Sequence, residues 1–439
     1  MFKNISDIKA SHLCYGCGSC NAVCSAQAIT MKYDEIGRLL PFIDETLCSN
    51  CGLCAKICPS VDLKNIQLPK TDFYIGNVIS TYIGKSNDEK IFKNAQSGGL
   101  VTAVLKKLFE TGEIDAAIVC KVEFTEKYTS NAVIITSVSE LYDCQKSSYV
   151  PVDICSAVKK IDDYKSIAVV GTGCHIQGIN ALKNFKQKFK EKIKYSFGLI
   201  CDRTLCKTVT DVLYSDYFSS ENKKLIWRDK SSNYKNASLV IKTANGKTQE
   251  LPRWQRFVLK DPFTNPRCRI CFDKLNVNAD IVFGDPWGMK NIDWQNGESV
   301  IITRTQNGDS LISKMIDEGD ILCKNAPLTE VIAGQLIEKR KLQVSSALKF
   351  YQKSGWQIPC YAEKLIVEGY EFAADNLILG FIADSKLSKE EIIKKNRYYL
   401  KKMRLQCIVK SIVSRCIKTF KQKCKSFYLA LKPTTKAQN

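Results

Sequence analysis

Apolar residues along the middle of the chain gather in short runs that alternate with longer amphipathic stretches. Short continuous apolar runs are typical of buried strands, and they occur at 114–122, 167–170, 195–200, 279–283 and 300–305. Helical spacing lies between them, at 100–110 after Ser-Gly-Gly, from 173 to about 185, and at 309–318. This alternation between about residues 75 and 335 predicts a mixed α/β core.

The two ends of the chain follow other patterns. Residues 1–65 are dense in cysteine, whereas the last part of the chain favours helices. From Leu405 to Phe420, apolar residues recur at helical i, i+3 and i+4 spacing among Lys and Arg residues. This basic amphipathic helix has three interpretations. It contacts an anionic membrane surface, it docks on the core or on an acidic partner, or it is solvated.

Positive charge is concentrated at the C-terminal end. The chain has a formal net charge of +20, and residues 389–439, with 15 Lys or Arg and 2 Asp or Glu, supply +13 of it. The remainder is only mildly basic, and the charges of the tail are not accompanied by aromatic stacking platforms. We therefore expect no nucleic-acid partner, and we name membrane-surface contact through 389–439 as one hypothesis.

Cysteine content points to metal. No apolar run approaches the ~18 residues of a spanning helix, and the first residues lack a signal-peptide pattern. We expect a cytoplasmic protein, soluble or peripheral at the inner membrane face. Twenty-one cysteines in such a compartment indicate metal ligands rather than disulfides. Only two histidines are present, so thiolate ligands dominate.

Two cysteine runs share one spacing, C-x2-C-x2-C-x3-C, and form an internal repeat. This spacing is that of a ferredoxin-type module with two [4Fe–4S] clusters, in which the fourth cysteine of each run binds the other cluster. The first cluster is then expected on Cys14, Cys17, Cys20 and Cys58, and the second on Cys48, Cys51, Cys54 and Cys24. Residues 1–65 are therefore predicted to carry electrons. We expect a surface or packing role for His12, which precedes the first ligand.

A second group of cysteines lies in the core. Cys268 and Cys271 form a C-x2-C pair, and Cys174 and Cys201 each follow a predicted strand. Together they could supply one more four-thiolate site. Cys206 competes with Cys174 for the fourth position, because it lies five residues after Cys201.

Several core motifs together resemble the family of coenzyme F420 hydrogenase/dehydrogenase beta subunits. They are QSGGLVTA at 96–103, SSYV at 147–150, VGTGCHI at 170–176, GLIC at 198–201, RCRIC at 267–271, ADI at 279–281 and GDPWG at 284–288. The resemblance covers about residues 75–325. It implies three regions: a ferredoxin-type domain at 1–65, a family core at 70–338 (parts at about 75–155 and 160–330), and a basic helical region at 339–439.

The resemblance implies a flavoprotein that passes electrons among iron–sulfur clusters, FAD and a substrate. Cys201, Cys268 and Cys271 match cluster-ligand positions of the family, and Cys174 is our choice for the fourth ligand of a third [4Fe–4S] cluster. Ser97, Gly98 and Gly99 match a flavin-contacting stretch, where a helix N-terminus can meet a pyrophosphate. Thr102 and Tyr149 complete the expected cofactor-binding residues. No catalytic acid or base is expected from any particular residue.

The chain departs from the family pattern at positions near the expected flavin site. His175 stands where related sequences commonly have Gln, and Lys146-Ser147-Ser148-Tyr149 replaces a more usual Gly-Ser-Lys-Tyr. We expect these changes to alter cofactor orientation or substrate. The G-T-G at 171–173 lacks the third glycine of a nicotinamide-binding fingerprint, because Ile176 stands in its place. The string RWQRF at 253–257 is expected to be a half-buried strand, with cofactor or substrate binding as the second interpretation.

These features predict an iron–sulfur flavoprotein oxidoreductase that exchanges a hydride with coenzyme F420 or another two-electron acceptor. Clusters carry single electrons, and a flavin converts between one- and two-electron chemistry. The expected partners are a redox protein or ferredoxin-type donor and a small two-electron substrate. The alternative is a non-catalytic subunit that relays electrons to a partner enzyme.

Overall fold

The computed structural model describes residues 2–62, 72–221, 223–230, 234–235, 237–368 and 374–406. Its strands are β1 (Ile29–Tyr33), β2 (Leu39–Ile43), β3 (Ser80–Ser86), β4 (Ala116–Phe124), β5 (Tyr128–Ile135), β6 (Ile167–Gly171), β7 (Ile193–Leu199), β8 (Lys223–Asp229), β9 (Ser238–Thr243), β10 (Thr248–Leu251), β11 (Ile281–Gly284), β12 (Ser299–Thr303) and β13 (Ile321–Asn325). Each of the five predicted strands overlaps one of these. The mixed α/β architecture is thus confirmed.

Helices separate and cover the strands. They are α1 (Ile5–Ala10), α2 (Ser19–Val23), α3 (Leu53–Lys56), α4 (Glu89–Asn94), α5 (Leu100–Glu110), α6 (Val138–Asp143), α7 (Gly173–Phe185), α8 (Gln187–Lys192), α9 (Thr208–Tyr214), α10 (Arg253–Val258), α11 (Pro266–Arg269), α12 (Gln306–Asp317), α13 (Leu328–Gly334), α14 (Ile337–Lys353) and α15 (Ala374–Asp384), with 3₁₀ helices η1 (Ile154–Lys160), η2 (Ser215–Tyr217) and η3 (Ala362–Leu365). The predicted helices correspond to α5, α7 and α12.

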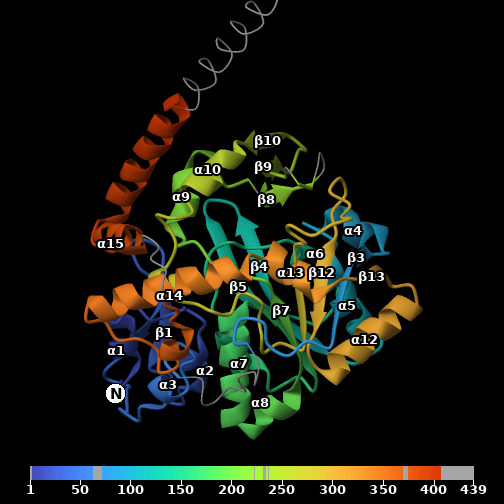
Figure 1. Cartoon of the computed structure of the whole chain (residues 1–439), viewed down its shortest axis with the longest axis horizontal. Coiled ribbons are helices and arrows are strands. Elements are labelled where there is room, and N and C mark those ends of the chain that lie inside the picture. Colours follow the sequence, from blue (N-terminus) through green and yellow to red (C-terminus); the bar gives the residue numbers. More distant parts are fainter. Residues whose placement is uncertain are drawn as a thin grey trace, which may run out of the picture.

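One large mixed sheet forms the centre of the molecule (Figure 1). Its strand order is β10-β9-β8-β4-β6-β7-β11-β12-β3-β13, and β5 pairs with β4 off this path. The central strands β4, β6, β7 and β11 run parallel to their neighbours in this group. The outer pairings, including β11 with β12 and β4 with β8, are antiparallel.

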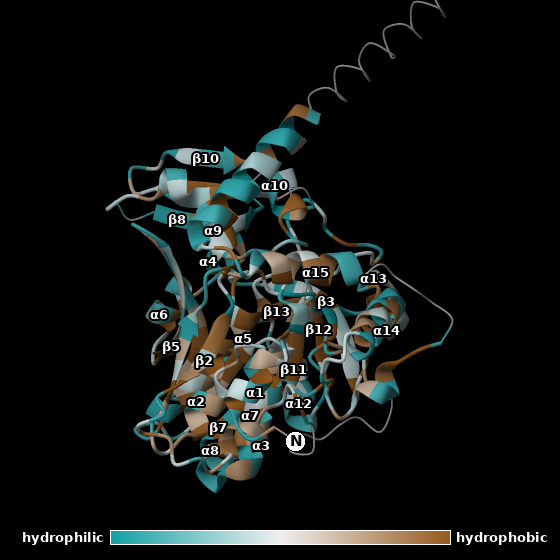
Figure 2. Ribbon diagram, turned by 90° about the vertical axis from the view of Figure 1, so that its left-hand side faces the viewer, coloured by the Kyte–Doolittle hydropathy of each residue, from teal (hydrophilic) through white to brown (hydrophobic). Residues whose placement is uncertain are grey.

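The two faces of the central strands pack against different helices. On β4, Ala117 and Val119 join a core cluster with residues of α5 and α12, whereas Ala116 and Ile118 join a cluster with residues of α2, α7 and η1. This alternation follows from the period of two along a strand. Figure 2 shows the apolar residues concentrated in the strands and in the helix faces turned towards them. The N-terminal module therefore sits on the α7 face of the sheet.

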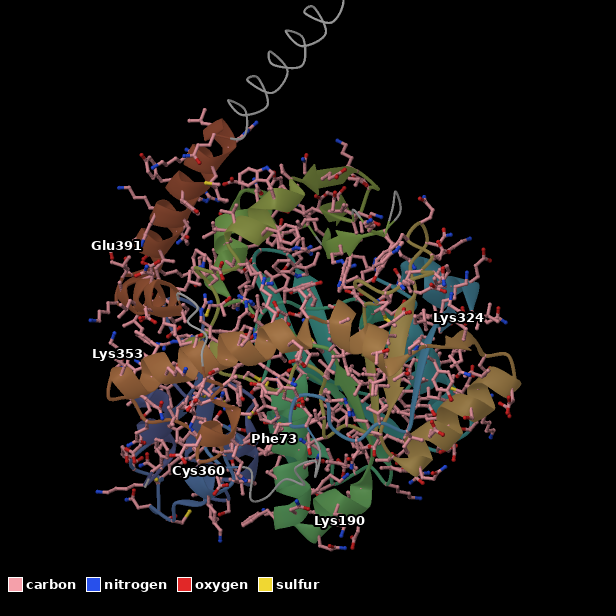
Figure 3. All side chains as sticks on the ribbon, viewed as in Figure 1. Phe73, Lys190, Lys324, Lys353, Cys360 and Glu391 are labelled. Atoms are coloured by element: carbon pink, nitrogen blue, oxygen red, sulfur yellow. The ribbon has the colours of Figure 1, made fainter. Side chains whose placement is uncertain are left out.

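The N-terminal module shares its core with the C-terminal region. Ile8, Leu13 and Ile29 belong to the same buried cluster as Val344 and Leu348 of α14. The backbone N–H of Cys360 also donates to the carbonyl of Val61 at 2.9 Å, and Figure 3 places Cys360 beside the module. The division into three regions stays a prediction, and its expected boundary between 338 and 339 falls within α14.

After α15, a further helix spans 389–406 and begins against the core. Ile392 is fully buried and Leu400 is 9% exposed, in a cluster that includes Val212 and Leu213 of α9. Lys389 pairs with Asp211 at 3.2 Å. The first turns of the basic tail thus dock on the core. The apolar positions expected from 408 to 420 lie outside the described residues, and membrane contact stays a prediction.

No helix among the described residues combines the length and apolarity needed to cross a membrane.

Candidate functional site

The internal repeat of the N-terminal module folds as two equivalent turns. Gly18 (φ 87°) precedes α2 and Gly52 (φ 71°) precedes α3, and both adopt the left-handed conformation that glycine tolerates. Each turn carries the last two cysteines of its run on or after the short helix. The repeat seen in the sequence is therefore also a repeat of backbone conformation.

Four cysteines expected to bind one cluster lie close together in the buried half of the module. Cys14, Cys17, Cys20 and Cys58 are all buried. Burial raises the pKa of Cys20, and the neighbouring Cys14, Cys17 and Cys58 raise it further. Burial also raises the pKa of Cys14 to about 12. Cys17 differs, because a hydrogen bond with the Cys155 side chain lowers its pKa to about 7. The raised pKa values of Cys14, Cys20 and Cys58 mean that thiolates at these three positions need a compensating positive charge, such as that of bound iron.

The other four cysteines of the module face the solvent more openly. Cys51 is exposed, while Cys24, Cys48 and Cys54 are partly exposed. Burial raises the pKa of Cys54, and the charge of Cys51 raises this pKa by a smaller amount. The module thus has a buried end at Cys14 to Cys20 and an accessible end at Cys51.

A second set of cysteines converges from separate places in the core. Cys174 is the second residue of α7, Cys201 follows β7, Cys268 belongs to α11 and Cys271 follows α11. Burial raises the pKa of Cys201, and Cys268 and Cys271 raise it further. Burial raises the pKa of Cys174 as well, with Cys17, Cys201 and Cys271 among the contributing charges. The ends of β6 and β7 and the segment around α11 therefore bring these cysteines together.

Cys206, the competing candidate, lies in an apolar environment. It is fully buried in a cluster with Val209, Leu213 and Phe263. Its backbone N–H donates to the carbonyl of Phe263 at 2.8 Å. Burial raises the pKa of Cys206, and the charge of Cys268 raises it further. No other cysteine in the described part of the chain is among the main causes of this shift.

Within the described residues, no group of three or more His, Cys, Asp or Glu side chains is placed to hold a single metal ion. Each iron of a cubane cluster takes one protein thiolate, so cluster ligands do not converge on one point.

Two buried arginines surround the second set of cysteines. Arg267 is 0% exposed, and its guanidinium donates to the carbonyls of Ile270 and Ser60 and to the Tyr361 hydroxyl. Its Nε is buried with no hydrogen-bond partner in the described part of the chain. Arg340, 5% exposed, donates to the carbonyls of Cys271 and Cys268 at 3.0 and 2.6 Å. Sequence analysis missed both residues, because nothing in their local pattern distinguishes a buried arginine from a surface one.

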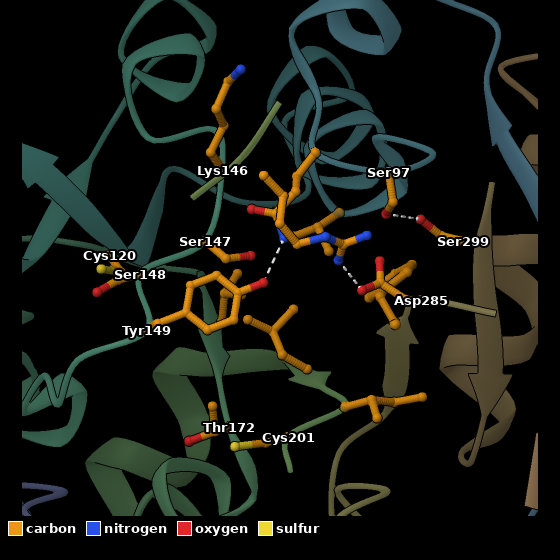
Figure 4. A pocket seen from close by; sticks show the side chains of 18 of the residues that line it. Ser97, Cys120, Lys146, Ser147, Ser148, Tyr149, Thr172, Cys201, Asp285 and Ser299 are labelled. Carbon is orange, nitrogen blue, oxygen red and sulfur yellow. Dashed lines mark hydrogen bonds and ion pairs between the residues drawn. The ribbon is translucent and has the colours of Figure 1, made fainter. Parts of the chain in front are cut away.

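A central cavity of about 610 Å³ opens beside Cys201, between the parallel strands and the β8–β10 hairpins. Of the expected cofactor-binding residues, Ser97, Gly99, Thr102 and Tyr149 line this cavity. In the view of Figure 4, Ser97 and Lys146 lie towards one end of the cavity, and Thr172 and Cys201 lie towards the other.

Gly98 is placed differently from its neighbours. Its N–H donates to Ser299 Oγ at 2.9 Å, and that hydroxyl also bonds Ser97 Oγ at 2.7 Å. A Cβ on Gly98 would meet the carbonyl oxygen of Gly84 at 2.5 Å. Gly98 therefore joins the loop to β3 and β12, and Gly99, with φ 78° at the start of α5, forms the turn that reaches the cavity.

Tyr149 is held at the cavity wall by three neighbours. Its hydroxyl accepts from Gln96 Nε2 at 3.1 Å, and its ring lies 5.2 Å from that of Trp227. The guanidinium of Arg256 lies 5.6 Å from the ring centre. Residues 253–258 form helix α10, so the expectation of a half-buried strand here is wrong. The helix turns Arg256 onto the cavity, which favours the second interpretation of the string.

The cavity lining is strongly basic. Its cationic members are Lys146, Arg203, Arg228, Lys235, Arg256, Lys260 and Lys274, and its acidic members are Asp202 and Asp285. Asp285 forms an ion pair with Arg228 and accepts from the Tyr234 hydroxyl at 2.7 Å. Such a lining suits a ligand with phosphate or carboxylate groups.

The two histidines have packing and capping roles in this structure. Nδ1 of His175 accepts from the N–H of Thr172 at 3.2 Å, which completes a capping box at the start of α7. Its Nε2 lies 2.7 Å from the carbonyl of Val152, and burial lowers its pKa to about 4. Gln is one of the usual residues at this position of a capping box, so His175 keeps the function of the residue it replaces. His12 packs against Trp356, with ring centres 4.9 Å apart.

Comparisons with known proteins agree with the resemblance seen in the motifs. Residues 81–159 match the N-terminal domain of the beta subunit of coenzyme F420 hydrogenase/dehydrogenase, and residues 164–328 match the C-terminal domain of the same beta subunit. Residues 13–61 match a "4Fe-4S dicluster domain".

Similar proteins include methanogen enzymes and parts of their complexes. One subunit of the F(420)H(2) dehydrogenase of Methanosarcina mazei is 26% identical over 77% of this chain and 92% of its own. Coenzyme F420-dependent sulfite reductase of Methanocaldococcus jannaschii is 28% identical over 70% of this chain and 46% of its own length. A chain of the F420-reducing [NiFe] hydrogenase complex from Methanosarcina barkeri shares the fold, with a TM-score of 0.51 and 21% identity over 64% of this chain and 94% of that one.

The two family matches together span more than half of the sequence, in the expected order and after a dicluster domain. The chain is an iron–sulfur oxidoreductase that belongs to the family of coenzyme F420 hydrogenase/dehydrogenase beta subunits.

Proposed function

We propose that the protein passes electrons between three [4Fe–4S] clusters and an FAD, and that it exchanges a hydride with coenzyme F420 or another two-electron acceptor. The observation that carries this proposal is the central cavity, whose lining includes both Ser97 to Thr102 and Cys201. A flavin in this cavity would adjoin a cluster held by Cys201. The relatives named for F420 chemistry support this choice of substrate.

The proposed ligands follow the sequence assignment. The first cluster binds to Cys14, Cys17, Cys20 and Cys58, the second to Cys48, Cys51, Cys54 and Cys24, and the third to Cys174, Cys201, Cys268 and Cys271. For the fourth ligand of the third cluster we favour Cys174 over Cys206. The charges of Cys201 and Cys271 both raise the pKa of Cys174, which places the three thiols near one another. Cys206, by contrast, lies among apolar side chains.

Buried positive charge supports a cluster at the third site. Arg267 has no carboxylate ion pair among the described residues, and the Nε noted above is left without an acceptor. An unpaired buried cation is costly, whereas a cluster bound by four thiolates carries net negative charge. Arg340 and Arg267 both lower the pKa of Cys271 against the larger effect of burial, so they favour the thiolate form that binds iron.

A short path connects the first and third sites. Cys155 is fully buried, and its N–H donates to the carbonyl of Cys17 at 3.0 Å. The charges of Cys17 and Cys174 both raise the pKa of the Cys155 thiol, after the larger effect of burial. Cys17 in turn acts on Cys174. We propose that electrons cross between the module and the core here, where α2 packs on α7 and η1.

The lining of the cavity fits an FAD. Its cationic side chains suit the pyrophosphate, and Tyr149 and Trp287 offer aromatic surface. When bound, the flavin would supply the conversion between single-electron and hydride chemistry. Tyr149, whose hydroxyl accepts a hydrogen bond from Gln96, would orient the bound flavin, and Cys201 lies at the wall of the same cavity.

The exposed end of the module is the proposed contact for a redox partner. Cys51 is exposed and Cys48 is partly exposed, so a donor or acceptor protein can approach the second cluster there. One relative is named as a subunit of a dehydrogenase and the structural relative belongs to a hydrogenase complex, which supports a protein partner.

Anaerobic purification with iron, sulfide and flavin quantitation tests the proposal. Three cubane clusters require about twelve irons per chain, and we expect one FAD. Reduced coenzyme F420 should then bleach the bound flavin. About eight irons would remove the third cluster. A protein that holds no flavin but still reduces a partner would be an electron relay, and hydride transfer would be excluded.

A further inference from the structure

The sulfur of Cys17 has two side-chain hydrogen-bond partners from different elements. Ser19, a buried residue at the start of α2, places its hydroxyl oxygen 3.4 Å from Cys17 Sγ. The thiol of Cys155, which is fully buried in η1, also forms a hydrogen bond with the Cys17 side chain. A hydroxyl and a thiol each carry a proton, so both can donate to Cys17 once it is a thiolate. The Cys17 corner of the first proposed cluster is thus hydrogen-bonded by two side chains.

Cys155 is fixed next to Cys17 by its own backbone and by helix α7. Its N–H donates to the Cys17 carbonyl at 3.0 Å, and its thiol lies 3.3 Å from the carbonyl oxygen of His175, which is a second acceptor. Helix α7 passes both sulfurs at Gly178, where a Cβ would lie 2.8 Å from Cys155 Sγ and 3.5 Å from Cys17 Sγ. Since 2.8 Å is shorter than a normal non-bonded contact, glycine is the residue that leaves room here for the Cys155 thiol.

Helix α7 also links this place to the third proposed cluster. Cys174, a proposed ligand of that cluster, lies four residues before Gly178 on the same helix. Residues four apart share one face of a helix. The same face of α7 therefore carries Cys174 and meets the sulfurs of Cys17 and Cys155. Hydrogen bonds to Cys17 thus act on the first cluster at the side from which electrons would pass to the third.

We propose that Ser19 and Cys155 are positioning residues that raise the reduction potential of the first cluster through their hydrogen bonds to Cys17. Reduction adds one electron, and so one negative charge, to the cluster and its thiolates. A hydrogen bond donated to a thiolate sulfur stabilises that added charge. Both donors keep their protons, and no covalent bond forms or breaks in this step. The inference rests on the proposed function only for the ligands of the first cluster.

Anaerobic redox titration of the iron-reconstituted full chain, with EPR detection, tests the two donors without any turnover. Ser19→Ala and Cys155→Ala each remove one donor, and both should lower the same midpoint potential. We expect the equilibrium constant for reduction to fall about tenfold in each, which is ~59 mV for one electron. Cys155→Ser keeps a donor and should restore the potential of the wild type. Cys323→Ala removes a half-buried thiol from β13 and is the control, which should titrate like the wild type.

The outcomes separate an effect on potential from support of the fold. Residues that only pack would lower stability when truncated and leave every midpoint potential unchanged, so an unchanged potential in Ser19→Ala or in Cys155→Ala overturns the proposal. Loss of about four irons from Cys155→Ala would make Cys155 a cluster ligand, which also overturns it. A protein that holds no flavin but shows both shifts and the rescue by Cys155→Ser would refute hydride transfer in the proposed function and leave the two donors established.

Discussion

The guanidinium of Arg267 lies 4.1 Å from the centre of the Tyr15 ring. Tyr15 directly follows Cys14, and Arg267 directly precedes Cys268, so this contact joins the loop of the first proposed cluster to the loop of the third. The same guanidinium donates to the Ser60 carbonyl, two residues after Cys58. One buried positive charge therefore lies between both proposed clusters.

Removal of this charge should make both clusters harder to reduce. A unit charge acting through an effective dielectric of ~20 changes a nearby site by roughly 1–2 kcal/mol, which is roughly 50–100 mV for one electron. We expect Arg267→Gln to lower the midpoint potentials of the first and third clusters by that amount, measured by anaerobic redox titration with EPR detection.

Arg304→Gln is the matched control for this measurement. Arg304 is also buried, at 7% exposed, and donates to the carbonyls of Ile75, Asn77 and Leu275. The charge that acts on the Arg304 guanidinium is that of Asp273, and no cysteine in the described part of the chain is among the causes of its pKa shift. Loss of a buried arginine will destabilise both variants, by about 3 kcal/mol. Equal potentials in Arg267→Gln and Arg304→Gln would show that Arg267 only supports the fold.

Cys174 and Cys206 can be separated by iron content. Cys174→Ala should lose the third cluster and retain about eight irons per chain, because eight ligands for two cubanes remain. Cys206→Ala should keep about twelve, since Cys206 packs among Val209, Leu213 and Phe263. The measurement is iron and sulfide quantitation after anaerobic reconstitution. The reverse pattern would assign the fourth ligand to Cys206.

The capping role of His175 predicts unequal effects of two substitutions. His175→Gln can still accept from the N–H of Thr172, so it should cost less than about 1 kcal/mol of unfolding free energy. His175→Ala loses the cap and the bond to the Val152 carbonyl, and should cost about 2 kcal/mol. Anaerobic urea denaturation at pH 7 measures both. Equal losses would mean that the ring itself, and not its hydrogen bonds, is required.

Two truncations separate the docked part of the tail from the rest. Removal of residues 389–439 uncovers the apolar positions of the cluster around Leu213 and takes away Ile392 and Leu400, so we expect a lower Tm. Removal of residues 407–439 alone keeps Ile392 and Leu400, so the Tm should fall less than it does on removal of 389–439. The thermal unfolding of each chain is followed by circular dichroism.

The same two truncated proteins test the membrane hypothesis. If residues 407–439 contact lipid, the full chain floats with vesicles that contain anionic lipid, and the protein that ends at residue 406 does not. The protein that ends at residue 406 keeps Arg397, which pairs with Asp216 of the core at 3.0 Å, so both proteins retain this docked part of the tail. Flotation that survives the truncation would exclude these residues as the anchor.

Much of this protein is determined by local sequence. The C-x2-C-x2-C-x3-C spacing and its glycines specify a turn and a short helix, which is why the repeat reappears at Gly18 and Gly52. Strands β6 and β7 and helices α5 and α7 were predicted because period and caps are properties of neighbouring residues. The string at 253–257 was misread because so short a run of aromatic and basic residues suits a strand or a helix equally well.

The relations between distant segments were decided only by the tertiary structure. Cys174 and Cys201 come to the same edge of the sheet because β6 and β7 are parallel and both end there. The choice between Cys174 and Cys206 as the fourth ligand stays a prediction. The electrostatic effect of Arg267 and Arg340 on the cysteines follows from their burial, because a charge that water cannot solvate acts strongly on its neighbours. Composition and spacing thus determined which atoms can bind clusters, whereas the fold determined which charges surround them, because electrostatic interactions depend on distance and burial in space and not on position along the chain.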